Sequence, residues 1–529
     1  MIEIKIRLPL AYTETDIRAR ACELLPILPH EILDAVLLHR RLDLDVHPPK
    51  EYVARVALSL APDREAGLLK MKKRVSPYTP HAFYTPTVTP PKERPVVVGA
   101  GPAGLFCTLI LAEAGLCPIL LERGLPVEER IRSVDAFHKT RTLDERSNIQ
   151  YGEGGAGTFS DGKLKFGKRD ADQWKVLSTF VELGAPEDIL YLDAPHLGTD
   201  RLVEIVKNMR RRLLALGADI RFSHRLSDLR ITDGRLTGLV VEREGQSAEI
   251  PTDTLFLAGG HSAHDVFQML DAHGICMEQR PFGIGVRIEH PQSLVNSWAY
   301  GEHAPNDLPP ASYHFVTHLK NGRSVYSFCM CPGGSVVAAT SSEGRLVTNG
   351  MSESRRDGAL ANAAFLVSVF PSDFSSDHPL AGFALQQRIE RDAFLAGGGD
   401  YTAPAIRMED FVGGHVPREP RGIQPTYPLG TRPVSPSAYL PAVLVDSLRQ
   451  AIFDFDAWRG GFYYPDAMLT GAETRSTSPV RILRGEDGVS PTLRGLYPVG
   501  EGAGYAGGIV SSAMDGVRAA MRYLSTLKK

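Results

Sequence analysis

The chain has little cysteine, little net charge and no pair of zinc-binding motifs. Its six cysteines are spread over 529 residues and form no pair of CxxC motifs, which argues against a disulfide framework and predicts no metal site. With 59 Lys plus Arg against 62 Asp plus Glu, the formal net charge of -3 provides no overall field for nucleic acid or anionic lipid. We therefore expect a reducing compartment and no nucleic-acid partner.

Features of membrane targeting are also scarce. Residues 1–16 alternate apolar and charged side chains, without the apolar run and small-residue cleavage site of a signal peptide, so a cytoplasmic protein is expected. Residues 96–121 are apolar enough to resemble a membrane span, but Pro102, Glu113 and four glycines interrupt them. We predict a buried strand–helix–strand unit there and no membrane span.

The length predicts several domains, since single cores rarely exceed roughly 200 residues. Residues 1–80 resemble an α+β module, with strands at 2–8, 32–40 and 52–60 and a helix at 14–25. Six prolines between positions 77 and 95 indicate a stiff linker, assigned to 81–95. The remaining chain is divided into a nucleotide-binding part at 96–270, a substrate domain at 271–480 and a returning nucleotide-binding part at 481–529.

Further elements are expected within these parts. A helix is predicted at 200–216, followed by consecutive strands at 219–226, 235–242 and 248–258. The substrate domain has short strand candidates at 284–288, 324–330 and 336–340, and an amphipathic helix is expected to end near residue 527.

The clearest motif is GxGxxG between an apolar strand and a helical stretch. Gly99 permits the tight turn, Gly101 lets the backbone approach a pyrophosphate, and Gly104 lets the helix pack on the strand. Pro102 and Ala103 begin the helix, whose free N–H groups and dipole favour a bound phosphate. The motif predicts dinucleotide binding, against the alternative of an ordinary glycine-rich turn.

An acidic residue completes this unit. Glu122 follows the second strand, 18 residues after Gly104, where a carboxylate accepts hydrogen bonds from the adenosine ribose. Glu122 and the adjacent Arg123 are therefore predicted to contact the cofactor.

Three further glycine-rich segments are predicted to contact the same cofactor. Residues 151–163 offer backbone N–H groups together with polar side chains, although a flexible surface loop is the alternative. Residues 255–260 form an apolar strand running into a glycine pair, and residues 495–509 repeat the pattern before a final helix whose N-terminus would favour negative charge. The predicted contacts are Gly155, Gly157, Thr158, Ser160, Lys163, Ala258, Gly259, Gly500, Glu501, Gly508 and Ile509.

In this order the segments resemble the FAD-binding signature of the glutathione-reductase-type flavoproteins, and Gly500-Glu501 resembles the turn of the succinate dehydrogenase flavoprotein branch. The chain is more similar still to a family of bacterial FAD-dependent dehydrogenases of poorly defined function. It shares strings similar to GEGGAGTFSDGKL, GVRIEHPQ, CMCPGG, ETRSTSPVRI and GEGAGYAGGI, which span nearly the whole sequence. The resemblance implies non-covalent FAD and leaves the substrate undefined.

Candidates for the reacting groups come from the predicted substrate domain. Arg287 alternates with apolar residues on a strand, which suits a substrate-anion clamp or a solvated strand face, and His290 suits a proton donor or a structural histidine. Cys331 belongs to a CxC pair that is either a redox dithiol or two small buried residues. Glu473 and Arg475 either approach the flavin or form an internal ion pair.

Together these features predict an α/β protein with a doubly wound, Rossmann-like FAD domain, an inserted mixed α/β substrate domain and an N-terminal α+β module. The expected function is a FAD-dependent oxidoreductase that transfers hydride through flavin N5 to or from a small molecule. No second GxGxxG unit is present, so NADH or NADPH would bind only transiently. An RNA-modifying flavoprotein and a partner-docking module with structural FAD are the alternatives, and the oligomeric state is left open.

Overall fold

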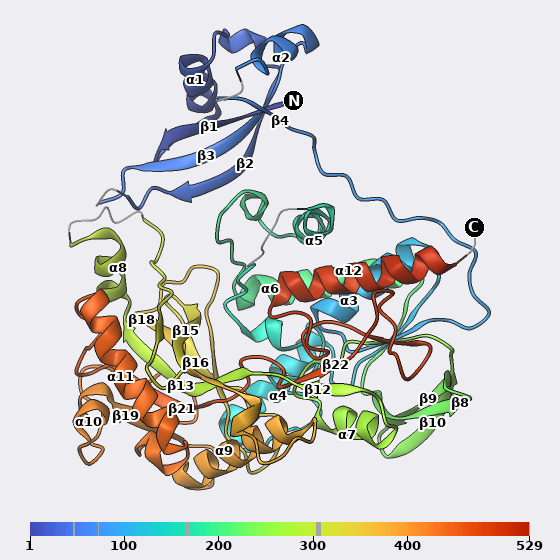
Figure 1. Cartoon of the computed structure of the whole chain (residues 1–529), viewed down its shortest axis with the longest axis vertical. Helices are drawn as coiled ribbons and strands as arrows, with labels where there is room; N and C mark the ends of the chain where they lie inside the picture. The colour runs from blue at the N-terminus through green and yellow to red at the C-terminus, as the bar shows by residue number, and fades with distance from the viewer. Residues whose placement is uncertain (46–47, 72–73, 165–169, 303–307, 528–529) are drawn as a thin grey trace.

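The computed structural model describes residues 1–45, 48–71, 74–164, 170–302 and 308–527. At its N-terminus, an antiparallel sheet of order β2-β3-β1-β4 carries two helices (Figure 1). Alternate residues of β1 are buried against them, as expected for a sheet with one covered face. The elements are β1 (Ile2–Pro9), α1 (Glu14–Leu24), β2 (Asp34–Leu42), β3 (Glu51–Ser59), α2 (Pro62–Leu68) and β4 (Ser76–Pro77). The three predicted strands and the predicted helix are confirmed, whereas α2 was not anticipated.

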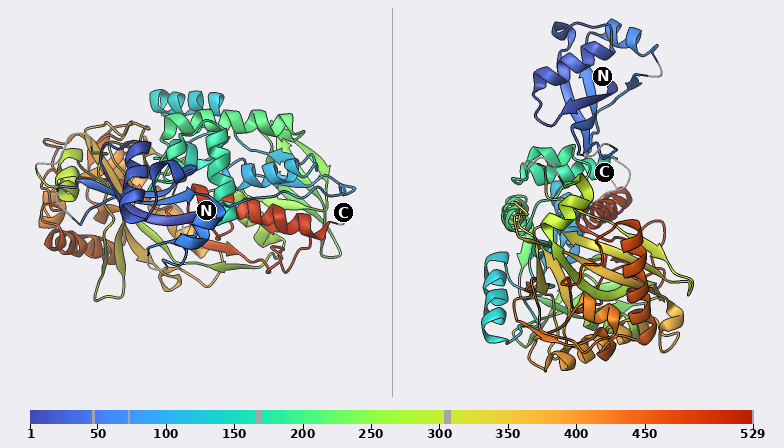
Figure 2. Two further views of the ribbon diagram at one scale, coloured as in Figure 1. Left: turned by 90° about the horizontal axis from the view of Figure 1, so that it is seen from above. Right: turned by 90° about the vertical axis from the view of Figure 1, so that its left-hand side faces the viewer.

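Residues 78–95 leave this sheet without helix or strand and run along the outside of the molecule to the parallel sheet (Figure 1). The N-terminal sheet projects from the rest of the chain (Figure 2). Arg40 of β2 contacts residues of the larger part directly. Its backbone exchanges hydrogen bonds with Tyr191 O and Asp193 N at 2.7 and 3.1 Å. Its guanidinium carbon lies 4.6 Å from the ring centroid of Tyr52 and 5.4 Å from that of Tyr191.

Replacing this arginine is expected to loosen the contact. A cation–π contact contributes about 0.5–2 kcal/mol, so Arg40→Ala should accelerate amide exchange in residues 186–193 by about 2- to 30-fold. Hydrogen–deuterium exchange read by mass spectrometry measures this. Arg55→Ala is the control, because Arg55 lies on the same sheet and, in the part of the chain that the structure describes, its ion pair is with Glu3 at 3.1 Å. Equal exchange in the two variants would contradict the prediction.

A five-stranded, wholly parallel sheet of order β23-β11-β5-β6-β7 forms the centre of the second part. The order runs in opposite directions on the two sides of β5, which makes the carboxyl end of β5 a switch point where ligands bind in such sheets. The expected Rossmann-like α/β class is therefore confirmed. The strands are β5 (Val96–Val98), β6 (Ile119–Leu121), β7 (Asp219–Arg221), β11 (Leu255–Leu257) and β23 (Leu496–Pro498).

Two helices from opposite ends of the sequence pack side by side on this sheet: α3 (Pro102–Glu113) and α12 (Ile509–Thr526) (Figure 1). A Cβ added at Gly516 of α12 would lie 2.1 Å from Ala103 O, so a glycine is needed at this crossing. Almost every residue of α3 is buried, as its uniformly apolar sequence requires. Further helices in this part are α4 (Val127–Thr140), α5 (Ala171–Glu182), α6 (Thr199–Ala215) and α7 (His264–Ala272), with short 3-10 turns η2 (Ala156–Phe159) and η3 (Glu187–Leu190).

Two predicted strands are corrected by the structure. The stretch 219–226 is broken at Ser223, whose φ of 58° turns the chain out of the parallel sheet, and 248–258 is broken before β11. The intervening residues form a separate antiparallel sheet of order β10-β9-β8. Its strands are β8 (Arg225–Thr232), β9 (Arg235–Arg243) and β10 (Gln246–Pro251).

The third part is built on a seven-stranded mixed sheet of order β14-β15-β18-β13-β21-β19-β20. Its central strands are buried on both faces and form one core with the helices around them. The strands are β13 (Phe282–Pro291), β14 (Val316–His318), β15 (Ser324–Cys331), β18 (Leu360–Val369), β19 (Ala403–Arg407), β20 (Thr431–Pro433) and β21 (Met468–Glu473). The helices are α8 (Gln292–Tyr300), α9 (Ala381–Gly397), α10 (Met408–Gly413) and α11 (Ala442–Trp458).

Two small strand pairs and three short turns complete the fold. The pairs are β12 (Met277–Gln279) with β22 (Val480–Ile482) and β16 (Ser335–Ala338) with β17 (Thr348–Met351), and the turns are η1 (Pro29–Glu31), η4 (Pro371–Asp373) and η5 (Pro436–Ala438). The division into domains at 80, 95, 270 and 480 stays a prediction. Among the described residues, no helix combines the length and the apolarity needed to cross a membrane.

Candidate functional site

The four glycine-rich segments meet at the carboxyl ends of β5, β11 and β23. A Cβ added at Gly99 would lie 2.4 Å from Ala258 O, and one added at Gly155 would lie 3.0 Å from Gly101 Cα. At Gly502 an added Cβ would lie 2.6 Å from the backbone of Gly260. Segments separated by 54 to 242 residues therefore pack backbone against backbone, which only glycine permits at such distances.

These segments enclose a cavity of about 300 Å³, a volume typical of small-molecule sites. Gly101 and Gly502 both line it, so the first and last glycine motifs face one space. Leu226 and Val266 line it from the second part of the chain, and Asn349 and Ser476 line it from the third part. The cavity thus passes from the parallel sheet to the mixed sheet.

Glu122 lies in the wall of this cavity with 5% of its surface exposed. Its carboxylate accepts backbone N–H groups of Ala100 at 2.8 Å, Gly124 at 2.9 Å and Gly152 at 3.1 Å. Oε2 takes only one of these bonds, so it can still accept a hydrogen bond from a ligand. The residue predicted to hold a ribose also ties two glycine-rich turns together.

Arg130 of α4 shapes the second glycine segment from behind. It is fully buried and donates to the carbonyls of Asn148 at 2.8 Å, Ile149 at 2.7 Å and Glu153 at 2.7 Å. Burial lowers the pKa of this guanidinium to about 10, so it remains charged at neutral pH. One arginine therefore satisfies several carbonyls of the loop, a role that the sequence pattern did not reveal.

The C-terminal glycine turn is held by Asp515 of α12. This carboxylate accepts Gly500 N at 2.7 Å and pairs with Arg484 at 2.6 Å. Gly500 has φ of 79°, and the turn it makes places Glu501 in the cavity wall.

Glu501 and His261 are two neighbouring titratable residues in this wall, and both have shifted pKa values. Glu501 Oε1 lies 3.7 Å from His261 Nε2, and burial raises the pKa of Glu501 to about 7. Burial, with Arg475 nearby, lowers the pKa of His261 to about 4. At neutral pH the histidine is therefore uncharged, and Glu501 exchanges a proton in the physiological range.

Glu501→Gln is expected to change how stability depends on pH. Between the ordinary carboxyl pKa and about 7, the folded wild type keeps a proton at Glu501 that the unfolded chain has released. Its free energy of unfolding therefore falls as pH rises through this window, and the glutamine variant lacks that contribution.

Thermal unfolding of both proteins from pH 4.5 to 8 measures the effect, and the difference in Tm should favour the variant increasingly as pH rises. Glu278→Gln is the control, because that side chain is 46% exposed. Parallel pH profiles for wild type and Glu501→Gln would contradict the assignment.

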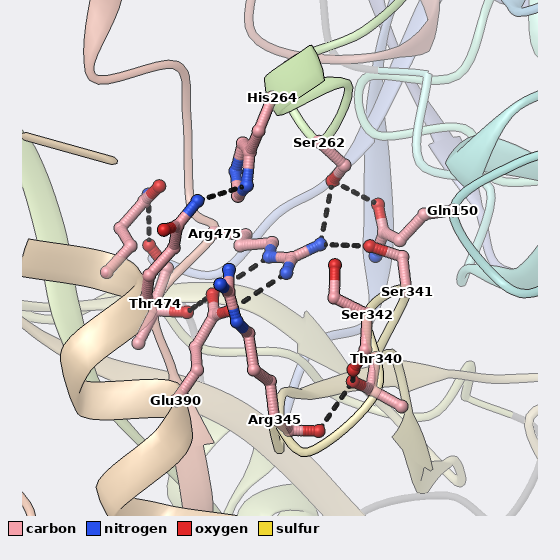
Figure 3. A network of polar contacts seen from close by, with 12 residues as sticks. Gln150, Ser262, His264, Thr340, Ser341, Ser342, Arg345, Glu390, Thr474 and Arg475 are labelled. Carbon is pink, nitrogen blue, oxygen red and sulfur yellow. Dashed lines mark hydrogen bonds and ion pairs between the residues drawn. The ribbon is translucent and has the colours of Figure 1, made fainter. Parts of the chain in front are cut away.

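Arg475 lies at the centre of a buried polar network (Figure 3). Its Nε and Nη2 donate to the two oxygens of Glu390 at 2.9 and 2.8 Å, and its Nη1 donates to Ser262 at 3.1 Å and Ser341 at 2.6 Å. Although burial alone would raise the pKa of Glu390, Arg475 holds it below its ordinary value. Thr474 donates to the same carboxylate at 2.7 Å. An ion pair thus exists, but its acid is Glu390 of α9, not the neighbouring Glu473.

Glu473 pairs instead with Arg287 of β13, at 3.0 and 3.1 Å. Arg287 is fully buried, also donates to Asn362 at 2.9 Å, and does not line the cavity, so the solvated strand face is corrected. Arg287 contacts Glu473, and Glu473 lines the cavity, so Arg287 can only position that carboxylate. His290 lies outside the cavity wall and bonds to Phe462 O at 3.0 Å, and burial lowers its pKa to about 4.

Most residues predicted to bind the cofactor line the cavity. They are Gly99, Gly101, Pro102, Ala103, Glu122, Arg123, Gly155, Gly157, Ser160, Lys163, Ala258, Gly259, Glu501, Gly508 and Ile509. Gly104, Thr158 and Gly500 do not. A Cβ at Gly104 would lie 1.8 Å from Gly99 O, so this glycine permits helix–strand packing, and the Thr158 side chain turns back toward Glu153 O.

Among the five catalytic candidates, Glu473 and Arg475 line the cavity and Cys331 does not. Sequence reasoning did not name His261 or Asn349, which line the wall, and of the CxC pair it named Cys331, whereas Cys329 lines the wall. His261 follows the glycine pair of the third segment directly, which was the available signal. Asn349 lies in a strand with no motif, and nothing local distinguished it.

Comparison with known proteins agrees with this geometry. Residues 281–476 match the sequence model of a family described as "FAD-dependent protein, C-terminal domain-like". A protein of Clostridium beijerinckii (strain ATCC 51743 / NCIMB 8052), named only "Uncharacterized protein", is 44% identical over 431 residues, covering 81% of this chain and 80% of that one. The chain belongs to this family of FAD-dependent proteins.

Solved structures with some likeness to this FAD-dependent protein are more distant. A 3-ketosteroid-Δ4-(5α)-dehydrogenase from Rhodococcus jostii RHA1 has 12% identity and a TM-score of 0.35, over 83% of this chain and 99% of that one. A geranylgeranyl bacteriochlorophyll reductase-like protein from Thermoplasma acidophilum has 11% identity and a TM-score of 0.36, over 82% of this chain and 78% of that one. The fold assignment rests on the strand order of the chain itself.

The cavity of this FAD-dependent protein suits a long ligand with a phosphate-bearing centre. The described part of the chain places no atom within 4 Å of a Cβ built at Gly260, Gly507 or Gly508, all of which line the cavity. Bare backbone therefore borders open space along the wall. The Nδ1 atom of His261 is buried and has no partner among the described residues. Exposed amides and an unpartnered polar atom fit a phosphate-bearing cofactor such as FAD.

Proposed function

We propose that this protein is an oxidoreductase that binds FAD non-covalently in the cavity and transfers hydride between flavin N5 and a small organic substrate. One observation supports the proposal above all others: all four glycine-rich segments line a single cavity. Membership of the family indicates that the cofactor is FAD, and the geometry of the cavity indicates which residues would hold it.

The two ends of the cavity have different chemistry. Glu122 and Arg123, with Leu226 beside them, would hold the adenosine. The N–H groups of Gly101, Ala103, Ala156 and Gly157 would hold the diphosphate, because α3 begins there and its unpaired N–H groups favour negative charge. Lys163, Glu501 and the start of α12 would surround the ring system.

When bound, FAD supplies a two-electron acceptor for hydride. The residues at the ring end provide the rest. The N-terminus of α12 at Gly508 favours negative charge at this end of the cavity. Glu501, whose pKa is about 7, can take up or release a proton near neutral pH, and Arg475 is held in place by its ion pair with Glu390. Glu473 and Asn349 face the same space and are proposed to position the substrate.

The test is flavin content followed by flavin reduction. Protein purified without added cofactor should be yellow and should release FAD, identified by mass spectrometry, on denaturation. Anaerobic stopped-flow mixing with NADH, NADPH and a panel of metabolites should then bleach the flavin with at least one of them. Protein that is colourless and takes up no FAD on reconstitution would overturn the proposal.

A further inference from the structure

Strand β15 contains a bulge near its C-terminal end, where it reaches the cavity. In the pairing of β15 with β18, Phe328 lies opposite Ala364 and Cys331 opposite Asn362, so β15 has one extra residue between them. Such a bulge redirects a side chain and occurs often beside active sites. Here it turns Cys329 into the cavity wall, while Cys331 behind it is fully buried.

The backbone at Cys329 is strained. Its φ of 41° lies in the left-handed region, which is strained for a residue with a side chain. The surrounding chain holds it there, because Arg287 Nη2 donates to Cys329 O at 2.7 Å. A Cβ added at Gly350 would lie 2.0 Å from the same Nη2, so a glycine leaves room for this guanidinium. Strain of this kind collects where the conformation has a function.

The two cysteines form one unit with Arg287. Cys331 Sγ lies 3.3 Å from Cys329 O, so its side chain turns back toward Cys329, and Arg287 Nη2 donates to Cys331 Sγ at 3.4 Å. A hydrogen bond from the Cys331 thiol lowers the pKa of Cys329, with Arg287 and then Lys163 acting in the same direction. The pKa of Cys331 is raised by the same hydrogen bond and by burial. These contacts favour the thiolate form at the cavity-facing Cys329 and the protonated thiol at the buried Cys331.

The pair also lies at the ring end of the proposed FAD site. Cys329 lines the cavity together with Lys163 of the second glycine segment and Glu501 of the last. All six cysteines lie in the described residues and are free, and Cys22, Cys107, Cys117 and Cys276 do not line the cavity.

We propose that Cys329 and Cys331 are a redox-active dithiol that exchanges two electrons with the bound FAD. The Cys329 thiolate and the Cys331 thiol lose two electrons and one proton and form one S–S bond. FAD takes up these two electrons and one proton, so charge and atoms balance, and the reverse reaction opens the disulfide. This inference rests on the proposed function, because FAD is the electron acceptor.

Two measurements on the full-length, FAD-loaded protein test it. In the first, air-oxidised and dithiothreitol-reduced protein are each denatured, alkylated and digested, and the peptide containing residues 329–331 is weighed. Oxidised protein should give an unalkylated peptide two hydrogens lighter than the free dithiol, and reduced protein a doubly alkylated one. This measurement needs no variant and no activity.

In the second, anaerobic titration with dithionite counts electrons per flavin. The wild type should take up four electrons, because the disulfide and FAD each accept two. Cys329→Ser and Cys331→Ser should each take up two while retaining flavin absorbance. Cys276→Ser should behave like the wild type, because Cys276 is exposed and does not line the cavity.

The outcomes separate the two proposals. Flavin-loaded wild type that takes up only two electrons, with both cysteines alkylated before reduction, would overturn the dithiol and leave the FAD site standing. Protein that binds no flavin would overturn the proposed function itself. A wild type that takes up four electrons but forms no Cys329–Cys331 peptide would also overturn the pair.

Discussion

Gly101→Val is expected to yield a folded protein that no longer retains FAD. Gly101 precedes α3 with φ of -78° and ψ of -179°, an extended conformation that valine adopts without strain. An added Cβ would have its nearest neighbour at 3.8 Å, so the folded chain tolerates it. The branched side chain, however, would occupy the space between the amides of α3 and Gly155, where the diphosphate is proposed to lie.

We expect FAD affinity to fall at least about 100-fold, equivalent to about 2.7 kcal/mol of binding free energy. Titration of apoprotein with FAD, followed by flavin fluorescence, measures it, and circular dichroism checks the fold. Gly67→Val is the matched control, since Gly67 is exposed on α2 and the described residues place no atom within 4 Å of a Cβ there. Unchanged FAD affinity in Gly101→Val would show that the diphosphate does not bind at this end of α3.

A neighbouring glycine should behave differently. Gly104→Ala would bring a Cβ to 1.8 Å from Gly99 O, which forces α3 away from β5. That variant should lose stability as well as flavin, and the contrast with Gly101→Val separates packing from cofactor binding.

Glu390→Gln is expected to have the largest effect on stability. Arg475 and Glu390 are 2% and 0% exposed, and the glutamine would keep the shape of the side chain while leaving the arginine as an uncompensated buried charge. Breaking a buried pair in this way costs about 3–5 kcal/mol of unfolding free energy. Equilibrium urea unfolding followed by circular dichroism measures the loss.

The control is an ion pair at the surface. Asp172→Asn removes one of the two acidic partners of Arg518, whose side chain is 41% exposed, and exposed pairs contribute only about 0–1 kcal/mol. Replacing both buried partners, as Glu390→Leu with Arg475→Met, should recover much of the stability, because no charge is then left unpaired. A loss in Glu390→Gln no larger than in Asp172→Asn would show that Arg475 is solvated.

Much of the nucleotide-binding unit could be predicted because its signals are local. The strand, the GxGxxG turn, the helix and Glu122 follow each other within 27 residues (96–122), and each motif glycine has a steric task in that unit. The strands around 219–258 were divided incorrectly, since a continuous run of β-forming residues does not reveal where Ser223 turns the chain into another sheet. Two consecutive strands there belong to different sheets, and only long-range pairing determines which.

The reacting end of the cavity was less accessible to such reasoning. Arg475 and Glu473 were singled out and do line the cavity, but their partners, Glu390 and Arg287, lie 85 and 186 residues away in sequence. Cys331 was considered because of its CxC motif, yet the bulge in β15 makes Cys329 the cavity-lining cysteine. A one-residue shift of this kind reverses which side chain faces the cavity, and no local pattern encodes it.

By itself, the sequence determined the α/β class, the dinucleotide-binding unit and the bare backbone that a diphosphate needs, because glycine spacing and hydrophobic periodicity act over a few residues. Tertiary structure alone decided which charges are paired and which thiol faces the cavity. The reason is physical: the pKa and reactivity of a side chain depend on burial and on neighbours that distant parts of the chain supply.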